Sequence, residues 1–245
     1  HLSRRHIRSM PQTIRPDPSV RASFAALTEY GGGTDESYLY CVDVLQRAEK
    51  LGFEICLIAQ RYLGADLDSW ILATALATQT KTMKIMAALH PGIADPRIAA
   101  KMGSSIDRIS GGRFCINIVN GLRKDEFAIY GQWLDQDQPR YRRMHEFIKV
   151  MKGLWTQDDF TFEGEYYSIK NGKLPTRPIQ NPHPPFYAAS RVDDGMDVVA
   201  HECGTWFVNY DRDRHKLPES LKRIESEIAI MEKRVSALGK SMVYG

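Results

Sequence analysis

The chain has 245 residues, the length of one large domain or two small ones, and its 33 Lys and Arg against 30 Asp and Glu leave a net charge of only +3. This balance argues against a nucleic-acid partner, and a hydrophobic content of 43% argues against a disordered chain. Apolar stretches stay below the roughly 18 residues of a membrane span, and the basic start lacks a following signal-peptide segment, so we expect a cytoplasmic protein without a membrane partner.

The first half of the chain alternates short apolar runs with helical patterns. A weak first strand is predicted at 7–14, where Pro11 interrupts it, and a helix is predicted from residue 36 to Gly52. Buried strands follow at 53–58, 83–89 and 113–119. Between them lie helices that begin at Asp68 and Asp95, both good N-cap residues, the second with Pro96 at the first helical position.

The second half begins with a long segment that interrupts this alternation. Residues 120–136 read as a loop with a helical turn at 124–130, followed by an amphipathic helix from about residue 139 and a hairpin at 160–169. A proline-rich linker then leads to a strand at 186–189, and a helix at 193–203, a strand at 205–208 and a helix at 218–238 complete the pattern. Residues 241–244 read as the start of another strand.

Repeated βα units of this kind predict an α/β fold built on a parallel sheet. We expect one domain over 1–245, a TIM-type (β/α)8 barrel that lacks its last strand or two in this chain, with a loop and hairpin insertion at about 120–180. An open doubly wound sheet is the alternative architecture, because it tolerates the same number of strands.

The four cysteines lie far apart in apolar segments and form no metal-binding or redox pair: Cys41, Cys56, Cys115 and Cys203. We therefore expect small buried hydrophobic side chains in a reducing compartment, and we predict no metal site.

In a parallel βα fold, ligand groups come from the carboxyl ends of the strands. This rule selects Gln60 and Arg61, His90, the segment 117–120 with Asn117, and the segment 190–192 with Ser190 and Arg191. The residues alone indicate a ligand-binding barrel and no specific reaction.

Each of these candidates also has an ordinary structural explanation. Arg61 presents a fork of donors to a phosphate or carboxylate, or forms a surface ion pair. His90 either moves protons or is a satisfied structural histidine. The buried amide of Asn117 meets either a ligand or the backbone. The helix after Ser190 offers N–H groups to an anion, although Asp193 and Asp194 would oppose a phosphate there.

Three blocks of the sequence closely resemble the bacterial luciferase-like family of flavin-dependent monooxygenases, with the alkanesulfonate, dimethyl sulfone and pyrimidine monooxygenases as the nearest branches. The blocks are KMGSSIDRISGGRFCINIVNGLRKDEFAIYG, WLDQDQPRYRRMHEFIKVMKGLW and FTFEGEYY. The match runs in consistent order over residues 51–208.

The resemblance implies a two-component monooxygenase. Such an enzyme takes reduced FMN from a separate NAD(P)H-dependent flavin reductase, adds O2 to form a peroxyflavin, and oxygenates a small organic substrate. It also implies a homodimer or homotetramer, and the apolar faces of the early helices offer a contact surface for it.

Carried over position by position, the family's flavin contacts fall on residues at the strand ends and on the insertion: Gln60, Arg61, Asn117, Glu126, Arg140 and Tyr141. Ser190 and Arg191 stand in the family's phosphate loop. We expect His90 and Asn117 to take part in catalysis.

The sequence departs from the family pattern at two places. Leu122 follows Gly121 where the family commonly has Trp, and Val192 stands where a serine hydroxyl is usual. These departures keep two alternatives open, namely a deazaflavin-dependent oxidoreductase of the same superfamily and a catalytically silent binding or assembly subunit.

Overall fold

The computed structural model describes residues 24–27, 37–121, 123–133, 136–208 and 216–245. Within these ranges seven parallel strands form one sheet in the order β1-β2-β3-β4-β7-β8-β9. The strands of this sheet are β1 (Phe24–Leu27), β2 (Ile55–Ile58), β3 (Lys84–Leu89), β4 (Phe114–Ile118), β7 (Phe186–Ala188), β8 (Thr205–Trp206) and β9 (Val243–Tyr244). A separate antiparallel hairpin contains β5 (Phe160–Glu163) and β6 (Ser168–Gly172).

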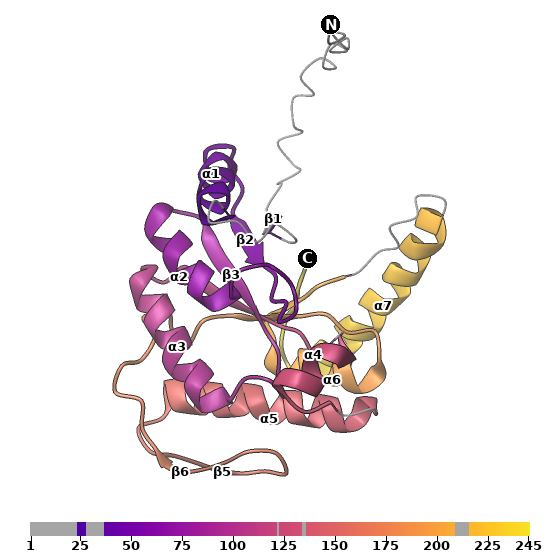
Figure 1. Cartoon of the computed structure of the whole chain (residues 1–245). Helices are drawn as coiled ribbons and strands as arrows, with labels where there is room; N and C mark the ends of the chain where they lie inside the picture. Colours follow the sequence, from indigo (N-terminus) through magenta and orange to yellow (C-terminus); the bar gives the residue numbers. More distant parts are fainter. Residues whose placement is uncertain (1–23, 28–36, 122, 134–135, 209–215) are drawn as a thin grey trace, which may run out of the picture.

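The helices connect the strands and lie mainly along one side of the sheet (Figure 1), whereas the short helix α4 (Lys124–Tyr130) lies at its carboxyl edge. They are α1 (Ser37–Lys50), α2 (Ser69–Gln79), α3 (Pro96–Ile109), α4 (Lys124–Tyr130), α5 (Asp137–Thr156), α6 (Asp193–Glu202) and α7 (Leu217–Ala237). Each strand of the sheet lies beside the next one along the chain, and the sheet curls as part of a barrel. The predicted TIM-type architecture is therefore confirmed. The doubly wound alternative is wrong, because its strand order would reverse direction within the sheet.

The predicted strands and helices from residue 37 onward are confirmed, including the insertion with its short helix and hairpin. The strand predicted at 7–14 lies outside the described residues, as does Leu122. The strand that pairs with β2 is β1 (Phe24–Leu27), which the sequence did not predict. Its four residues include two alanines and no β-branched side chain, so its local strand preference is weak.

Two aspartates cap the helices that follow β2 and β3. Asp68 Oδ1 accepts hydrogen bonds of 3.0 Å from the backbone N–H groups of Trp70 and Ile71. Asp95 Oδ1 accepts one of 2.8 Å from Arg97 N. These caps satisfy orphan donors of the first helical turn, and they hold the preceding loops at the carboxyl edge of the sheet.

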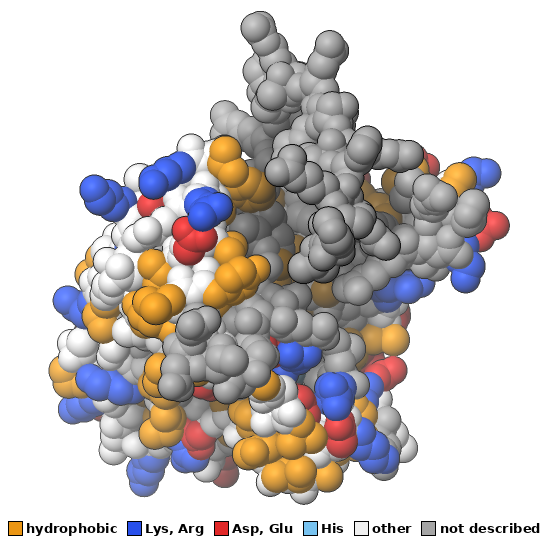
Figure 2. Space-filling model, turned by 45° about the horizontal axis from the view of Figure 1, so that its top comes forward, with side chains coloured by type: hydrophobic (Ala, Val, Ile, Leu, Met, Phe, Trp, Pro, Cys, Tyr) orange, Lys and Arg blue, Asp and Glu red, His pale blue; other side chains and the backbone are white. Residues whose placement is uncertain are grey.

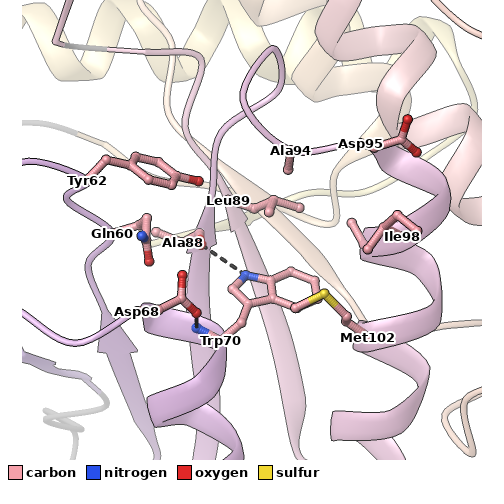
Figure 3. A pocket seen from close by; sticks show the side chains of 11 residues that line it. Gln60, Tyr62, Asp68, Trp70, Ala88, Leu89, Ala94, Asp95, Ile98 and Met102 are labelled. Carbon is pink, nitrogen blue, oxygen red and sulfur yellow. Dashed lines mark hydrogen bonds between the residues drawn. The ribbon is translucent and has the colours of Figure 1, made fainter. Parts of the chain in front are cut away.

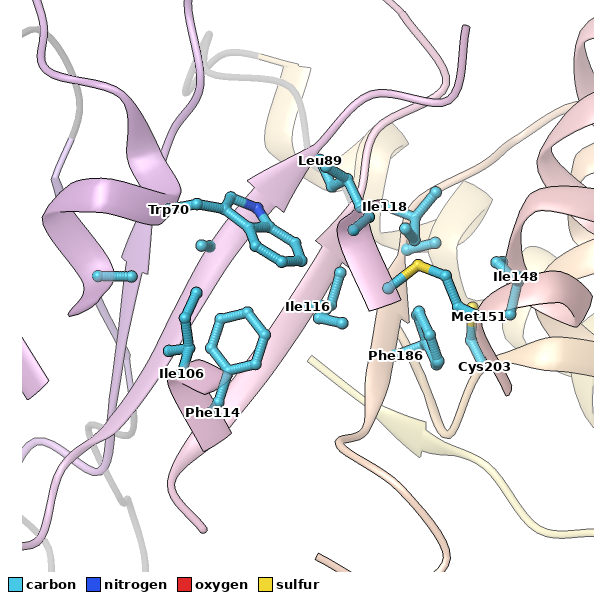
Figure 4. Packing of buried hydrophobic residues seen from close by; sticks show 14 of the residues in the cluster. Trp70, Leu89, Ile106, Phe114, Ile116, Ile118, Ile148, Met151, Phe186 and Cys203 are labelled. Carbon is cyan, nitrogen blue, oxygen red and sulfur yellow. The ribbon is translucent and has the colours of Figure 1, made fainter. Parts of the chain in front are cut away.

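The two faces of the sheet have different partners. The outer face packs against the helices, and Figure 4 shows Trp70, Phe114, Ile116 and Phe186 in this layer. On the inner face, Met86, Cys115 and Tyr187 form a smaller cluster. Side chains alternate between the faces along a strand, so Asn117, two residues after Cys115, lies on the inner face as well.

The four cysteines are free and buried, as predicted. Burial raises the pKa of the Cys56, Cys115 and Cys203 thiols to about 12. These thiols are therefore protonated at neutral pH and pack as small apolar groups.

A buried carboxylate ties the insertion to α3. Asp107 is fully buried and accepts hydrogen bonds from the backbone N–H groups of Ile179 (2.7 Å) and Gln180 (3.0 Å). Its other oxygen accepts from Gln180 Nε2 at 2.6 Å. The linker from the hairpin to β7 is therefore fixed by a charge-assisted network.

Exposed apolar side chains gather on the outer surfaces of α1, α2 and α3, and Figure 2 shows hydrophobic groups on this side of the molecule. We call this surface the α1–α3 apolar face, defined by Leu39, Tyr40, Ile71, Ile98 and Met102. In the part of the chain that the structure describes, no helix is both long and apolar enough to cross a membrane.

Candidate functional site

The strand-end candidates share one edge of the sheet. Gln60 follows β2, His90 follows β3, Asn117 lies near the end of β4, and Ser190 follows β7. Because the strands are parallel and adjacent in this order, their carboxyl ends form a single rim. The structure therefore brings the four positions to one side of the molecule.

His90 is buried, with 5% of its surface exposed, and lies against two aromatic rings. Its ring centroid is 5.8 Å from that of Tyr62, edge to face, and 6.2 Å from that of Phe127. Burial lowers the pKa of His90 to about 4, and a hydrogen bond to the Gln60 carbonyl opposes this shift only in part. The imidazole is therefore uncharged at neutral pH.

One ring nitrogen of His90 also lacks a hydrogen-bond partner among the described residues. Nδ1 is buried and unpartnered. Because buried polar atoms are normally satisfied, this nitrogen marks a place where a polar group of a ligand could bind.

The two residues after β2 are held by local contacts. Gln60 Oε1 accepts a hydrogen bond of 2.6 Å from Ser69 N, at the start of α2. Arg61 forms an ion pair with the buried carboxylate of Asp66, with Nε 2.6 Å from Oδ2. The ion pair that the sequence allowed for Arg61 is therefore one of its contacts. In Gln60 the amide oxygen is engaged, so the amide nitrogen is the atom that could donate to a ligand.

Glu126 is almost fully buried at 1% exposure on the short helix α4. Its Oε1 accepts a hydrogen bond of 3.3 Å from Leu63 N, which connects α4 to the loop after β2. Burial, together with the charges of Asp68 and Glu126, raises the pKa of Tyr62 to about 12. The Tyr62 hydroxyl is therefore protonated and can donate a hydrogen bond.

Tyr141 and Ser190 form the other end of the rim. The Ser190 hydroxyl donates to Tyr141 Oη at 3.0 Å, and Trp206 Nε1 donates to the Ser190 carbonyl at 3.0 Å. Gly195 of α6 allows this contact, because a Cβ there would overlap Ser190 Oγ and would lie 2.5 Å from Tyr141 Cε1. Tyr141 and Ser190, which were both predicted to contact the flavin and are 49 residues apart along the chain, therefore lie side by side.

The charges around the start of α6 are largely paired. Arg191 points to α7, where its Nε lies 3.2 Å from Glu227 Oε1. Arg234 of α7 pairs with Asp193 and Asp197. Of the two carboxylates expected to oppose a phosphate at this helix, Asp193 and Asp194, the first therefore has a cationic partner. Val192 provides no side-chain cap to the first N–H groups.

Arg140 lies at the start of α5, in the insertion. It pairs with Asp137, and its guanidinium carbon is 4.7 Å from the ring centroid of Trp133. Its Nε is buried without a partner. Arg140 and Tyr141 thus both lie near the N-terminus of α5, as the sequence predicted.

Buried polar atoms without a partner concentrate at this rim. Among the described residues there are eight such side-chain atoms, and six belong to His90, Asn120, Arg140 and Arg143. Both amide atoms of Asn120 are among them. Native proteins normally satisfy buried polar groups, so this concentration indicates the place of a polar ligand. Sequence reasoning included Asn120 only as the end of a segment, and it did not select Tyr62 or Arg143.

A small cavity of about 210 Å³ lies beside this rim, between the N-terminal ends of α2 and α3 (Figure 3). Trp70, Leu89 and Met102 give it an apolar wall, while Gln60 and Tyr62 supply polar groups. Tyr62 borders both the cavity and the His90 ring, and Gln60 belongs to both the cavity wall and the rim, so the cavity adjoins the rim.

The model of the luciferase-like monooxygenase family matches residues 20–237. The chain belongs to the luciferase-like monooxygenase family. It is 34% identical over 206 residues to an FMNH2-dependent dimethylsulfone monooxygenase of Pseudomonas putida, covering 82% of this chain and 54% of the relative. A protein of the same description from Pseudomonas fluorescens (strain Pf0-1) is 36% identical over 182 residues, covering 72% and 49%.

The luciferase-like chain thus spans about half the length of the curated relatives that it matches. Among solved structures, the monooxygenase RslO1 from Streptomyces bottropensis is similar with a TM-score of 0.77 at 20% identity, covering 89% of this chain and 67% of that one. This similarity supports the barrel fold.

Proposed function

We propose that this protein is an FMNH2-dependent monooxygenase that transfers one oxygen atom from O2 to a small, uncharged organic substrate of the dimethyl sulfone class. The observation that carries the proposal is the rim with two polar ends, one at His90 and one at the Ser190–Tyr141 pair. The names of the Pseudomonas relatives support the choice of cofactor and substrate class.

The dimensions of the rim fit an elongated cofactor with an aromatic ring at one end and a phosphate at the other. His90 follows β3 and Ser190 follows β7, with β4 between them. Strands lie about 4.8 Å apart, so the span from Gln60 on β2 to Ser190 is about 14 Å. Asn117 lies between the ends and presents its amide on the inner face.

The residues at each end have chemistry that suits the corresponding part of FMN. Ser190, Tyr141 and the uncapped N-terminus of α6 offer donors to the phosphate. His90, Tyr62 and Asn117 would contact the ring and its polar edge. Bound reduced FMN would supply the electrons that activate O2, and the protein orients it and keeps water away.

The uncharged, buried ring of His90 suits a hydrogen-bonding role. Its unpartnered Nδ1 would bind a polar group of the cofactor or substrate, and the position beside Phe127 excludes water. The adjacent cavity beside Trp70 has room for a small uncharged molecule, and the Tyr62 hydroxyl and the Gln60 amide could donate to oxygen atoms of such a substrate.

The proposal includes a separate NAD(P)H-dependent flavin reductase as the source of reduced FMN and a homodimer or homotetramer as the assembly. Both follow from membership of a family whose relatives carry FMNH2-dependent names. The α1–α3 apolar face is the contact surface that we propose for the assembly.

The test is an anaerobic titration of the protein with FMNH2, followed by mixing with 18O2 in the presence of dimethyl sulfone. Saturable binding and one 18O atom in the oxidised product are the expected results. Binding of a reduced deazaflavin but not of FMNH2 would favour the deazaflavin-dependent alternative. Absence of binding to both cofactors would refute the proposed function.

A further inference from the structure

The loop that carries His90 is packed against the loop after α4. The backbone N–H of Gln132 donates to the Gly92 carbonyl at 2.9 Å. A Cβ at Gly131 would overlap that same carbonyl and would lie 2.7 Å from Ile93 Cγ1. The two loops, 90–95 and 131–133, therefore touch through their backbones and leave no room for a side chain between them.

Arg143 of α5 lies beneath this contact and touches both loops. Its NH1 donates to the Gln132 carbonyl at 2.8 Å. Its guanidinium lies on the backbone of Gly92, where a Cβ would be 2.6 Å from NH1 and closer still to Cζ and NH2. Gly92 has a φ of 96°, a conformation that glycine adopts without strain.

The burial of Arg143 is unusual for a cation. The residue is 3% exposed, and its Nε and NH2 atoms are buried without a partner. Burying a charged group with incomplete hydrogen bonding is costly, so a guanidinium at such a place implies a specific task. The contacts show what that task is, because the side chain joins α5 and the nearby loop 131–133 to the loop 90–95, which is far earlier in the sequence.

The hairpin also contacts this glycine, through Tyr167. Glu146, three residues after Arg143, accepts hydrogen bonds from the backbone N–H groups of Glu165 and Tyr166, both at 2.8 Å. Burial raises the pKa of Tyr167 to about 12, while the charge of Arg143 and a hydrogen bond from the Gly92 backbone oppose the shift. Helix α5 therefore holds the hairpin turn and the His90 loop together.

We propose that Arg143 is a positioning residue that locks loop 90–95 against loop 131–133 and thereby fixes the His90 ring at the rim. The role of His90 toward the flavin rests on the proposed function, whereas the lock itself does not. Without Arg143 the Gln132 carbonyl loses its donor and Gly92 loses its packing partner. The loop then loosens, and water reaches the imidazole between Tyr62 and Phe127.

The experiment compares Arg143→Met with Arg142→Met in the full 245-residue chain. The control removes the same charge one residue earlier, where the side chain is 45% exposed and pairs with Glu165. The measurement is the NMR titration of the His90 ring from about pH 5.5 to 8, assigned with His90→Gln. We expect the signal to stay constant in the wild type and in Arg142→Met, and to titrate in Arg143→Met as the pKa rises toward its ordinary value.

A second measurement separates this inference from the proposed function. We expect Arg143→Met to bind FMNH2 about tenfold more weakly, the equivalent of one lost hydrogen bond, and Arg143→Lys to recover part of that loss. If the wild type does not bind FMNH2, the proposed function is refuted. The NMR result then still tests whether Arg143 holds the two loops together. A folded Arg143→Met with an unchanged His90 signal would overturn the lock. If that variant does not fold, an unchanged His90 signal in Gly92→Ala overturns it instead.

Discussion

Gly195 provides the sharpest test of the phosphate end of the site. A methyl group at this position would overlap Ser190 Oγ and lie 2.5 Å from Tyr141 Cε1, so the Tyr141 ring must move in Gly195→Ala. At a helix position where a methyl group meets no other atoms, replacing glycine by alanine stabilises the protein by about 0.5–1 kcal/mol. Here overpacking costs about 1–3 kcal/mol, and the Tyr141–Ser190 hydrogen bond adds about 1 kcal/mol when it breaks.

The expected result is a net loss of about 1–3 kcal/mol in the free energy of unfolding, measured by urea denaturation, with FMNH2 affinity about tenfold weaker. Gly204→Ala is the matched control, because a Cβ there meets nothing within 4 Å. If Gly195→Ala is as stable as the wild type and binds FMNH2 equally well, the close packing of Tyr141 on α6 does not hold the site together.

Three further predictions concern a surface carboxylate, the His90 ring and the apolar face. Burial alone would raise the pKa of Glu49, but hydrogen bonds from the N–H groups of Lys81–Met83 outweigh this effect and lower the pKa to about 2. The carboxylate therefore stabilises the fold above about pH 4.5, and this stabilisation is lost as the pH falls toward 2. We expect Glu49→Gln to cost about 1 kcal/mol at pH 7 and almost nothing near pH 2, as urea denaturation at both pH values would show. His90→Ala should lower the rate of 18O transfer at least about 100-fold while FMNH2 still binds, and an unchanged rate would remove His90 from the chemistry. Ile71→Glu combined with Ile98→Glu should convert the assembly to monomers in light scattering, and an unchanged mass would place the interface elsewhere.

The sequence predicts much of this fold because the decisive signals are local. Asp95 followed by Pro96 marks a helix start that depends only on residues of the first helical turn, and the structure shows the expected cap. The largely apolar runs of β3 and β4, the second interrupted only by Asn117, indicate strands that are covered on both faces. The unexpected strand β1 has no such signal, since its pairing with β2 supplies the order that its own residues do not favour.

The site is less predictable because its contacts join distant segments. The strand-end rule places Gln60, His90, Asn117 and Ser190 at one edge, since the rule depends only on the direction of the strands. It says nothing about Arg143. In the run PRYRR, Arg142 and Arg143 look alike, and only the fold separates an arginine that is half exposed from one that is buried under Gly92.

Helix α5, in the insertion between β4 and β7, contacts both ends of the proposed site. Tyr141 and Arg143 are two residues apart, so they leave the helix in widely different directions. Tyr141 reaches Ser190 at one end of the rim, and Arg143 reaches the His90 loop near the other end. One helical turn thus ties both ends of the proposed flavin site to the same rigid element. A displacement of α5 would change the position of the phosphate donors and of His90 together, so we expect the losses from Gly195→Ala and Arg143→Met to be non-additive in FMNH2 affinity.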